Sequence, residues 1–330
     1  MKIVQKAMKK MLFICLILIL SNLQSISNSQ GKINNVETYA LLVDQFAPNS
    51  NNPGQYFCNA IEFRNSLLSI GWDESNFYYL FGDVEISVSN VQAKMDLLIQ
   101  NVDENDVVVC FFATHGYGCL RDILNFNLWF HDYFLDIKTD YKYLLIDACH
   151  ASEFIEPLDA YKSAESFYAM GSVAPQEYAI GFVPDDQEEW VYSEPEFLGI
   201  ISSHFWSQTL TNSSADVNSD SYIDMKEMYD YSLPIIKKIY NEIFLADSEM
   251  ADFIMTNTGY IDDYPRPVVI NSLSENISLY SDYLTANIAS IGGLTQPQKL
   301  GIIFGSIGSV IVIAVIVFSA VRIKKKSKSI

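Results

Sequence analysis

Two short segments decide the fold: Asp106-Val-Val-Val-Cys-Phe-Phe-Ala-Thr-His115-Gly116-Tyr-Gly118 and Tyr141-Lys-Tyr-Leu-Leu-Ile-Asp147-Ala-Cys149-His150-Ala-Ser152. Each begins with a short apolar run, rich in β-branched and aromatic residues and free of Gly and Pro, which is typical of a strand buried on both faces. Open α/β sheets place their active sites at the carboxyl ends of such strands. A His after one strand and a Cys after the next therefore predict a thiol nucleophile with its base.

The chemistry of a cysteine nucleophile explains why these residue types occur together. The thiolate is the reactive form, and a neighbouring base both favours it and manages the protons of the reaction. His115 suits this role, because it can also protonate the leaving amine. An oxyanion needs hydrogen-bond donors, and Gly116 lets its own N–H come close, with the N–H of Cys149 as the second donor. The alternative is that His115 and Cys149 are unconnected residues that end two core strands.

The residues around this pair resemble those of a known family. His-Gly at 115–116 and Asp-x-Cys-His-Ala-Ser at 147–152 resemble segments of metacaspases, and are similar to the corresponding segments of legumain, caspases and the catalytic subunit of the GPI transamidase. The resemblance covers residues 37–270 and implies a caspase-like peptidase domain, which is an α/β fold with a mostly parallel sheet and helices on both faces. It also implies that His115 and Cys149 form the catalytic dyad, with Gly116 and Cys149 as the oxyanion hole.

The same resemblance implies a specificity pocket. In this family the residue two before the Cys lines the pocket for the substrate residue that precedes the cleaved bond, and it is acidic in metacaspases, which cleave after Arg or Lys. Asp147 takes this position here, and a carboxylate can pair with Arg through both oxygens. Metacaspases add a second acid near the first helix, for which Asp44 or Glu62 is the candidate. The alternative for Asp147 is a carboxylate that caps nearby backbone amides.

Sequence periodicity predicts further elements around these segments. Strands are predicted at 39–44, 76–81, 165–171, 178–182, 251–256 and 267–270, and helices at 56–70, 89–100, 199–211 and 225–244. Residues 117–140 are expected to form a loop-rich insertion. Strands that alternate with helical stretches predict a mostly parallel sheet covered on both faces.

Both ends of the chain have membrane-related patterns. Residues 1–27 combine four Lys with a short apolar stretch, typical of a secretory signal peptide, with an uncleaved anchor as the alternative. Residues 300–321 form an uncharged run long enough for a transmembrane helix, and the basic tail at 322–330 places that end in the cytoplasm. A linker at 28–36 and a Ser-, Asn- and Thr-rich stalk at 271–299 flank the domain. We therefore expect a single-pass membrane protein with an extracellular or lumenal domain.

Charge and cysteine content limit the possible partners. The chain has 21 basic and 40 acidic residues and a net charge of −19, and the part between the two membrane-related ends is more acidic still. Such a surface repels nucleic acid and anionic lipid and attracts cations and basic peptides. Cys110, inside a strand, is expected to be a buried hydrophobic residue. If Cys149 is a free thiol, Cys58–Cys119 is the one disulfide worth testing.

Residues 216–227 match the twelve-residue calcium-binding loop of an EF-hand. The pattern needs side-chain oxygens at positions 1, 3, 5, 9 and 12 and a backbone carbonyl at position 7. The predicted Ca²⁺ ligands are Asp216, Asn218, Asp220, Tyr222, Asp224 and Glu227. Ser221 stands where Gly normally makes the sharp turn. The expected role of the ion is structural, and the alternative is an acidic turn between two helices.

These features predict a membrane-anchored, extracytoplasmic cysteine endopeptidase that acts on protein or peptide substrates. The first alternative is a transamidase or an asparaginyl-type peptidase resembling legumain; in a transamidase an amine instead of water resolves the thioacyl intermediate. The second alternative is a calcium-binding surface module with a degenerate site, which remains open because Ala151-Ser152 replaces the usual Ser-Gly of the family. The sequence leaves the oligomeric state undecided.

Overall fold

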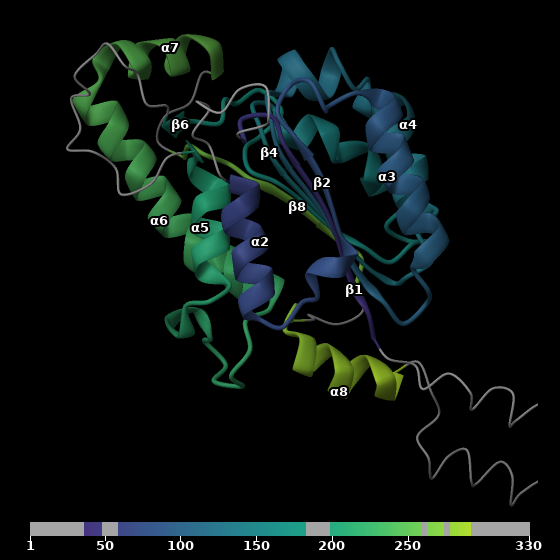
Figure 1. Ribbon diagram of the computed structural model, residues 1–330. Helices are drawn as coiled ribbons and strands as arrows, with labels where there is room; N and C mark the ends of the chain where they lie inside the picture. Colours follow the sequence, from purple (N-terminus) through teal and green to yellow (C-terminus); the bar gives the residue numbers. More distant parts are fainter. Residues whose placement is uncertain (1–35, 48–58, 183–198, 259–262, 274–277, 292–330) are drawn as a thin grey trace, which may run out of the picture. The chain divides into compact units, whose positions relative to one another are not determined.

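A six-stranded sheet with the order β2-β1-β3-β4-β5-β8 organises the computed structural model (Figure 1). The residues described are 36–47, 59–182, 199–258, 263–273 and 278–291, and all but Val36 belong to one compact unit. The strands are β1 (Thr38–Asp44), β2 (Phe77–Phe81), β3 (Val107–Ala113), β4 (Tyr141–Asp147), β5 (Tyr168–Gly171) and β8 (Val268–Asn271). Neighbouring strands are parallel except β5 and β8, which confirms the expected mostly parallel α/β sheet.

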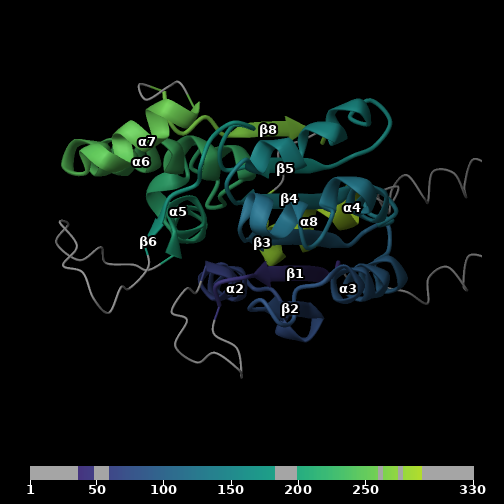
Figure 2. The same ribbon diagram turned by 90° about the horizontal axis from the view of Figure 1, so that it is seen from above.

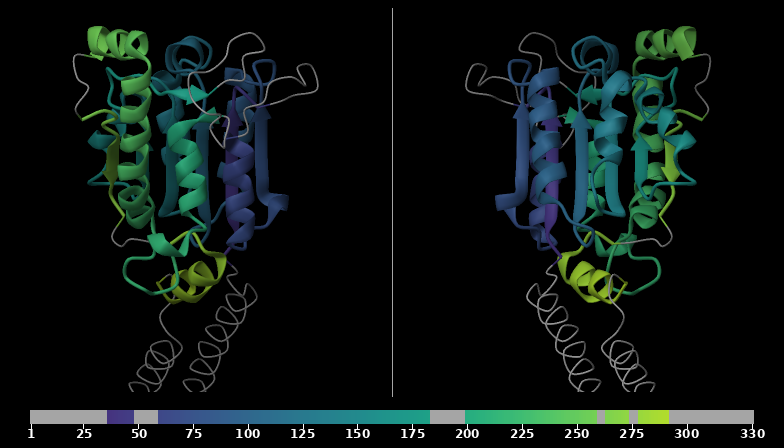
Figure 3. Two further views of the ribbon diagram at one scale, coloured as in Figure 1. Left: turned by 90° about the vertical axis from the view of Figure 1, so that its left-hand side faces the viewer. Right: turned by 90° about the vertical axis from the view of Figure 1, so that its right-hand side faces the viewer.

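Helices cover both faces of this sheet, as Figures 2 and 3 show. One face carries α2 (Asn59–Ser69), α5 (Ile201–Thr209) and α6 (Met225–Ala246), and the other carries α3 (Val88–Asn101) and α4 (Phe126–Leu135).

Successive side chains of β3 point to opposite faces, as strand geometry requires. Phe111 stacks on Phe63 of α2 with 4.6 Å between ring centroids, whereas Phe112 meets Phe126 and Phe130 of α4 edge-on at 5.2 Å each. Each such pair contributes about 0.5–1.5 kcal/mol beyond the burial of its area. Because these contacts lie on both faces, they fix β3 in the middle of the core.

The insertion between β3 and β4 is helical, so the loop expected over residues 117–140 is wrong for most of that range. A π-helical turn, Gly116–Arg121, follows β3 and α4 follows it. The apolar face of α4 is buried against the sheet. Lys142 is buried and donates from Nζ to the carbonyl oxygens of Leu135 and Ile137, at 2.9 and 3.0 Å. These bonds satisfy carbonyl oxygens that have no amide partner within the helix.

Two of the predicted strands differ in the structure. The segment 251–256 is not a strand but part of α7 (Ser248–Thr258), which follows α6 directly and packs against it. Periodicity alone does not separate a short apolar strand from a short helix, and here the neighbouring helix decides. Of the segment 178–182, only β6 (Gly181–Phe182) is a strand, and it pairs with β7 (Gly199–Ile200) outside the main sheet.

Part of the expected stalk packs onto the domain. Helix α8 (Ser281–Ile291) lies in the range 271–299, and Leu279 and Leu284 are fully buried. The indole N–H of Trp72 donates to the carbonyl oxygen of Leu279 at 2.6 Å. The folded unit therefore extends at least to α8.

No helix in the described part of the chain is both long and apolar enough to cross a membrane. The predicted signal peptide, membrane span and basic tail all fall outside the described residues, as does Cys58. Cys119 carries a free thiol and is fully buried in the core between the sheet and α4, so the structure does not contain the Cys58–Cys119 disulfide.

Candidate functional site

Three neighbouring parallel strands end at the same level, and this register brings the predicted site together. Asp44 of β1 pairs with Ala113 of β3, which pairs with Asp147 of β4. The pairing continues one residue further, because the amide of Thr114 donates to the carbonyl oxygen of Asp147 at 3.2 Å. His115 and Cys149 each lie two residues beyond their strand. They therefore occupy equivalent positions on adjacent loops.

Gly116 is the point at which these two loops touch. A Cβ atom built on Gly116 would lie 1.9 Å from the carbonyl oxygen of Cys149, far inside any allowed contact. Only Gly fits at this position unless the backbone moves. The close approach shows that Gly116 is needed for the two loops to pack, whatever chemistry follows.

His115 is exposed, and its neighbours come from the loop after β1. Its backbone amide donates to Oε1 of Gln45 at 2.9 Å, and its ring packs edge-on against Phe46 with 4.8 Å between centroids. Gln45 is held in turn, because its Nε2 donates to Asp83 at 2.6 Å. These contacts fix the backbone of His115 and leave its imidazole at the surface.

Cys149 is partly buried, and its thiol lies 3.7 Å from the carbonyl oxygen of Ala179. No hydrogen bond joins this thiol to the imidazole of His115 in the structure. Burial raises the pKa of the Cys149 thiol above its ordinary value, and the charge of Asp147 adds to the increase. The resting thiol is therefore neutral at pH 7, and it needs a base or a change in the local charge to become a nucleophile.

Asp147 is fully buried, and one of its two oxygens is occupied. Oδ2 accepts from the backbone amide of Ser203 at 2.6 Å and from its hydroxyl at 2.7 Å, which ties β4 to the first turn of α5. Oδ1 makes no hydrogen bond of normal length, although the Ser172 side chain lies near enough to the carboxyl to interact with it. Burial raises the pKa of Asp147 to about 6, although the Ser203 and Ser172 side chains oppose this shift.

Asp44 is also fully buried, and both of its oxygens are in use. Oδ1 accepts from the amides of Phe46 and Ala47 at 2.9 and 3.1 Å, and Oδ2 accepts from the amide of Ala60 in α2 at 2.9 Å. Burial raises the pKa of Asp44 to about 7, and the nearby charge of Asp147 contributes to the increase. Asp44 is buried and holds three backbone amides, so its geometry in this structure is that of an anchor for α2 and the loop after β1.

Several residues that the sequence did not single out hold this edge of the sheet. The side chain of Asn59 bonds both the amide and the carbonyl of Ile200, at 2.9 and 3.0 Å, and so joins the starts of α2 and α5. A Cβ on Gly199 would lie 2.5 Å from Asn59, and the φ of this residue is +130°. A polar residue at a helix start is too common a pattern to have revealed this contact.

His150 is a buried link between the two loops. A ring nitrogen, Nδ1, lies 2.6 Å from the carbonyl oxygen of Pro175, so that nitrogen carries the hydrogen. The ring stacks on Tyr117, with 4.1 Å between centroids and 7° between planes. Since Tyr117 follows Gly116, this stack is a second contact between the segments that carry His115 and Cys149.

The predicted calcium loop folds as a tight turn before α6. Oδ2 of Asp216 accepts from the amide of Ser221 at 2.9 Å, and Ser221 has a φ of +74°, the conformation that Gly normally provides. Glu227 accepts from the amides of Val217 and Asp224 at 3.0 and 3.1 Å. No three His, Cys, Asp or Glu side chains converge to hold a metal anywhere in the described residues. The carboxylates of this loop face its own amides.

The two buried carboxylates predict how stability depends on pH. Their folded pKa values, about 7 and about 6, lie above the value of about 3.9 for an exposed Asp, so the stability that the neutral forms provide is complete below pH 3.9 and is lost as pH rises through 6 and 7. We expect Asp147→Asn to keep an acceptor for Ser203 while removing the charge. Its melting temperature should fall less between pH 5 and pH 8 than that of the wild type, with a difference on the order of 1–2 kcal/mol in unfolding free energy.

Thermal unfolding of both proteins, followed by circular dichroism across this pH range, measures the difference. An equal or steeper decrease for Asp147→Asn would show that Asp147 is not held near neutrality in the folded state.

Comparison with known proteins adds no assignment to this geometry. No model of a known protein family matches the chain, and no curated protein gives a significant match.

Proposed function

We propose that this protein is a membrane-anchored cysteine endopeptidase that acts outside the cytoplasm and cleaves after basic residues. Cys149 is the nucleophile and His115 the base. The observation that supports this most strongly is the contact between Gly116 and the Cys149 carbonyl, because it leaves the imidazole-bearing and thiol-bearing loops side by side at the carboxyl end of the sheet. The resemblance of both loops to the metacaspase segments supports the same reaction.

In the proposed reaction His115 takes the proton of the Cys149 thiol, and the thiolate attacks the carbonyl carbon of the peptide bond. The backbone N–H groups of Gly116 and Cys149 stabilise the oxyanion. His115 then gives its proton to the departing amine, which leaves a thioester on Cys149. Water hydrolyses this thioester in the second half of the reaction and restores the thiol.

Substrate charge would assist the first step. The charge of Asp147 contributes to the raised pKa of Cys149, and a basic side chain paired with Asp147 would cancel that contribution. Binding of the correct substrate would then lower the pKa of the nucleophile. This arrangement agrees with the neutral, partly buried thiol of the resting structure.

Loss of either member of the dyad should abolish turnover. We expect Cys149→Ser to reduce kcat/KM by more than about 10³-fold and His115→Ala by about 10²–10⁴-fold, because each removes a group that acts in the transition state. The assay uses the full chain in detergent with fluorogenic peptides that carry Lys, Arg, Asn or Asp before the cleaved bond. Cys119→Ala is the matched control, because it removes another free thiol from the same region.

The peptide preference and the products separate the alternatives. Cleavage after Asn would contradict the role of Asp147, and transfer of the acyl group to added glycinamide in preference to water would indicate a transamidase. Full activity in Cys149→Ser would refute the proposed nucleophile. No turnover by the wild type, with Cys149 inert to thiol reagents, would favour the binding module.

We also propose that residues 216–227 bind calcium, because the loop matches the EF-hand spacing and Ser221 already has the positive φ that the turn needs. The residues that would hold the ion are Asp216, Asn218, Asp220, Tyr222 through its carbonyl, Asp224 and Glu227. Bound Ca²⁺ supplies positive charge that connects α6 to the preceding turn.

Calcium should raise the melting temperature of the full chain, and Glu227→Gln should remove most of this increase. The Gln retains one oxygen for the helix cap but loses the bidentate carboxylate. Glu242→Gln, an exposed substitution on α6, is the control and should respond to calcium like the wild type. A melting temperature that calcium leaves unchanged, or an equal increase in Glu227→Gln, would overturn the proposed site.

A further inference from the structure

The segment between β5 and β6 lies along the loop that carries Cys149 and presents backbone carbonyl oxygens to it. These oxygens belong to every second residue, namely Val173, Pro175, Glu177 and Ala179. The carbonyl oxygen of Glu177 accepts from the amide of His150 at 2.7 Å, and that of Ala179 lies 3.7 Å from the Cys149 thiol. The position of this segment therefore determines where the thiol lies.

The peptide unit between Cys149 and His150 is fixed on both sides. Its carbonyl oxygen packs against Gly116, where a Cβ atom would lie 1.9 Å away, and its N–H donates to Glu177. Because a peptide unit is planar and rigid, these two contacts together set its orientation. They also set the spacing between the loop that carries His115 and the loop that carries Cys149.

The side chain of Glu177 attaches this segment to the rest of the domain. The carboxylate is fully buried, and all of the donors that it binds come from two residues. Oε1 accepts from Nε of Arg266 at 2.5 Å, and Oε2 accepts from the amides of Ala174 and Arg266 at 3.1 and 2.8 Å. Hydrogen bonds between charged groups are among the strongest in proteins, and a buried carboxylate depends on them.

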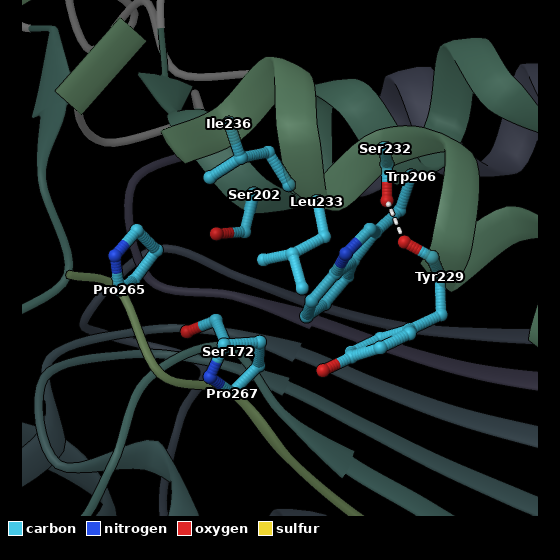
Figure 4. Close-up of a pocket in the computed structure, with 9 residues that line it drawn as sticks. All are labelled: Ser172, Ser202, Trp206, Tyr229, Ser232, Leu233, Ile236, Pro265 and Pro267. Atoms are coloured by element: carbon cyan, nitrogen blue, oxygen red, sulfur yellow. Dashed lines mark hydrogen bonds between the residues drawn. The ribbon is translucent and has the colours of Figure 1, made fainter. Parts of the chain in front are cut away.

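Arg266 comes from a stretch of chain with little backbone freedom. It lies between Pro265 and Pro267, and proline fixes its own φ and restricts the residue before it. Figure 4 shows both prolines at a small cavity that Ser172 at the end of β5 and Ile236 of α6 also line. Arg266 is therefore a firm support for the buried carboxylate.

We propose that Glu177, held by Arg266, is a positioning residue for Cys149. Through its carbonyl oxygen it keeps the peptide unit after Cys149 against Gly116, and so keeps the thiol within reach of His115. The expected effect on turnover rests on the proposed function. The contact itself can be measured without turnover.

The first experiment measures hydrogen exchange of residues 148–154 in the full chain in detergent. Glu177→Gln keeps the size of the side chain and one acceptor oxygen but loses the charge that binds Arg266. We expect exchange in this segment to be at least about tenfold faster than in the wild type, because the bond to the His150 amide is weakened. Arg266→Lys, which keeps the positive charge but loses the planar guanidinium, should give a smaller increase and serves if Glu177→Gln fails to fold.

Asp263→Asn is the matched control. It removes an exposed ion pair with Lys237 only three residues from Arg266, and its exchange should match that of the wild type. Unchanged exchange in both Glu177→Gln and Arg266→Lys, or an equal increase in Asp263→Asn, would overturn the proposal.

The second experiment separates positioning from a general loss of stability. We expect Glu177→Gln to lower kcat at least about tenfold and to leave KM within about twofold, because Glu177 aligns the reacting groups and does not bind the substrate. In the His115→Ala background the same substitution should reduce the residual rate much less, since the aligned base is already absent. A substitution that only destabilises the fold would lower the rate equally in both backgrounds.

The two experiments distinguish this inference from the proposed function. Faster exchange in Glu177→Gln together with no hydrolysis by the wild type would support the contact and contradict the peptidase. Hydrolysis that depends on Cys149, with kcat unchanged in Glu177→Gln or with equal losses in both backgrounds, would support the peptidase and overturn the positioning role.

Discussion

The carboxyl edge of the sheet depends on two buried carboxylates that bond to backbone amides and not to cations. Asp44 and Asp147 end the strands on either side of β3. Asp44 binds the first turn of α2 and Asp147 the first turn of α5, where the positive end of a helix favours a negative charge. Asn59 then joins the two helix starts. The loop that carries His115 leaves the sheet between these anchors.

The anchors determine where His115 and Cys149 lie. By binding the amides of Phe46 and Ala47, Asp44 shapes the short turn from which Gln45 reaches the backbone of His115. On the other side, Asp147 fixes the end of β4 two residues before Cys149. Asp44 therefore holds the turn that contacts the backbone of His115. Asp147 holds the amide and hydroxyl of Ser203 through Oδ2, which is the capping role that its sequence position allows.

The sequence was sufficient for the features that depend on local patterns. The uninterrupted apolar runs of β3 and β4 identified buried parallel strands, and their polar ends identified the loops that the structure brings into contact. Hydrogen bonds between side chains and distant segments could not be predicted from the sequence. Asp44 was a candidate for the second acid of the specificity pocket because the resemblance to metacaspases implies one near the first helix, and only the three amides around it reveal an anchor. Likewise, the sequence of α7 suits a strand, and its packing against α6 makes it helical.

The most direct test of this account is the site at which a peptide with a lysine acyloxymethyl ketone modifies the full chain. Mass spectrometry of proteolytic fragments should find the label on Cys149 alone, with a labelling rate at least about 10²-fold lower in His115→Ala. Cys110 and Cys119 should remain unlabelled, because burial raises the pKa of both thiols, that of Cys119 to about 12. Labelling of Cys149 at the same rate without His115, or no labelling of Cys149, would contradict the dyad.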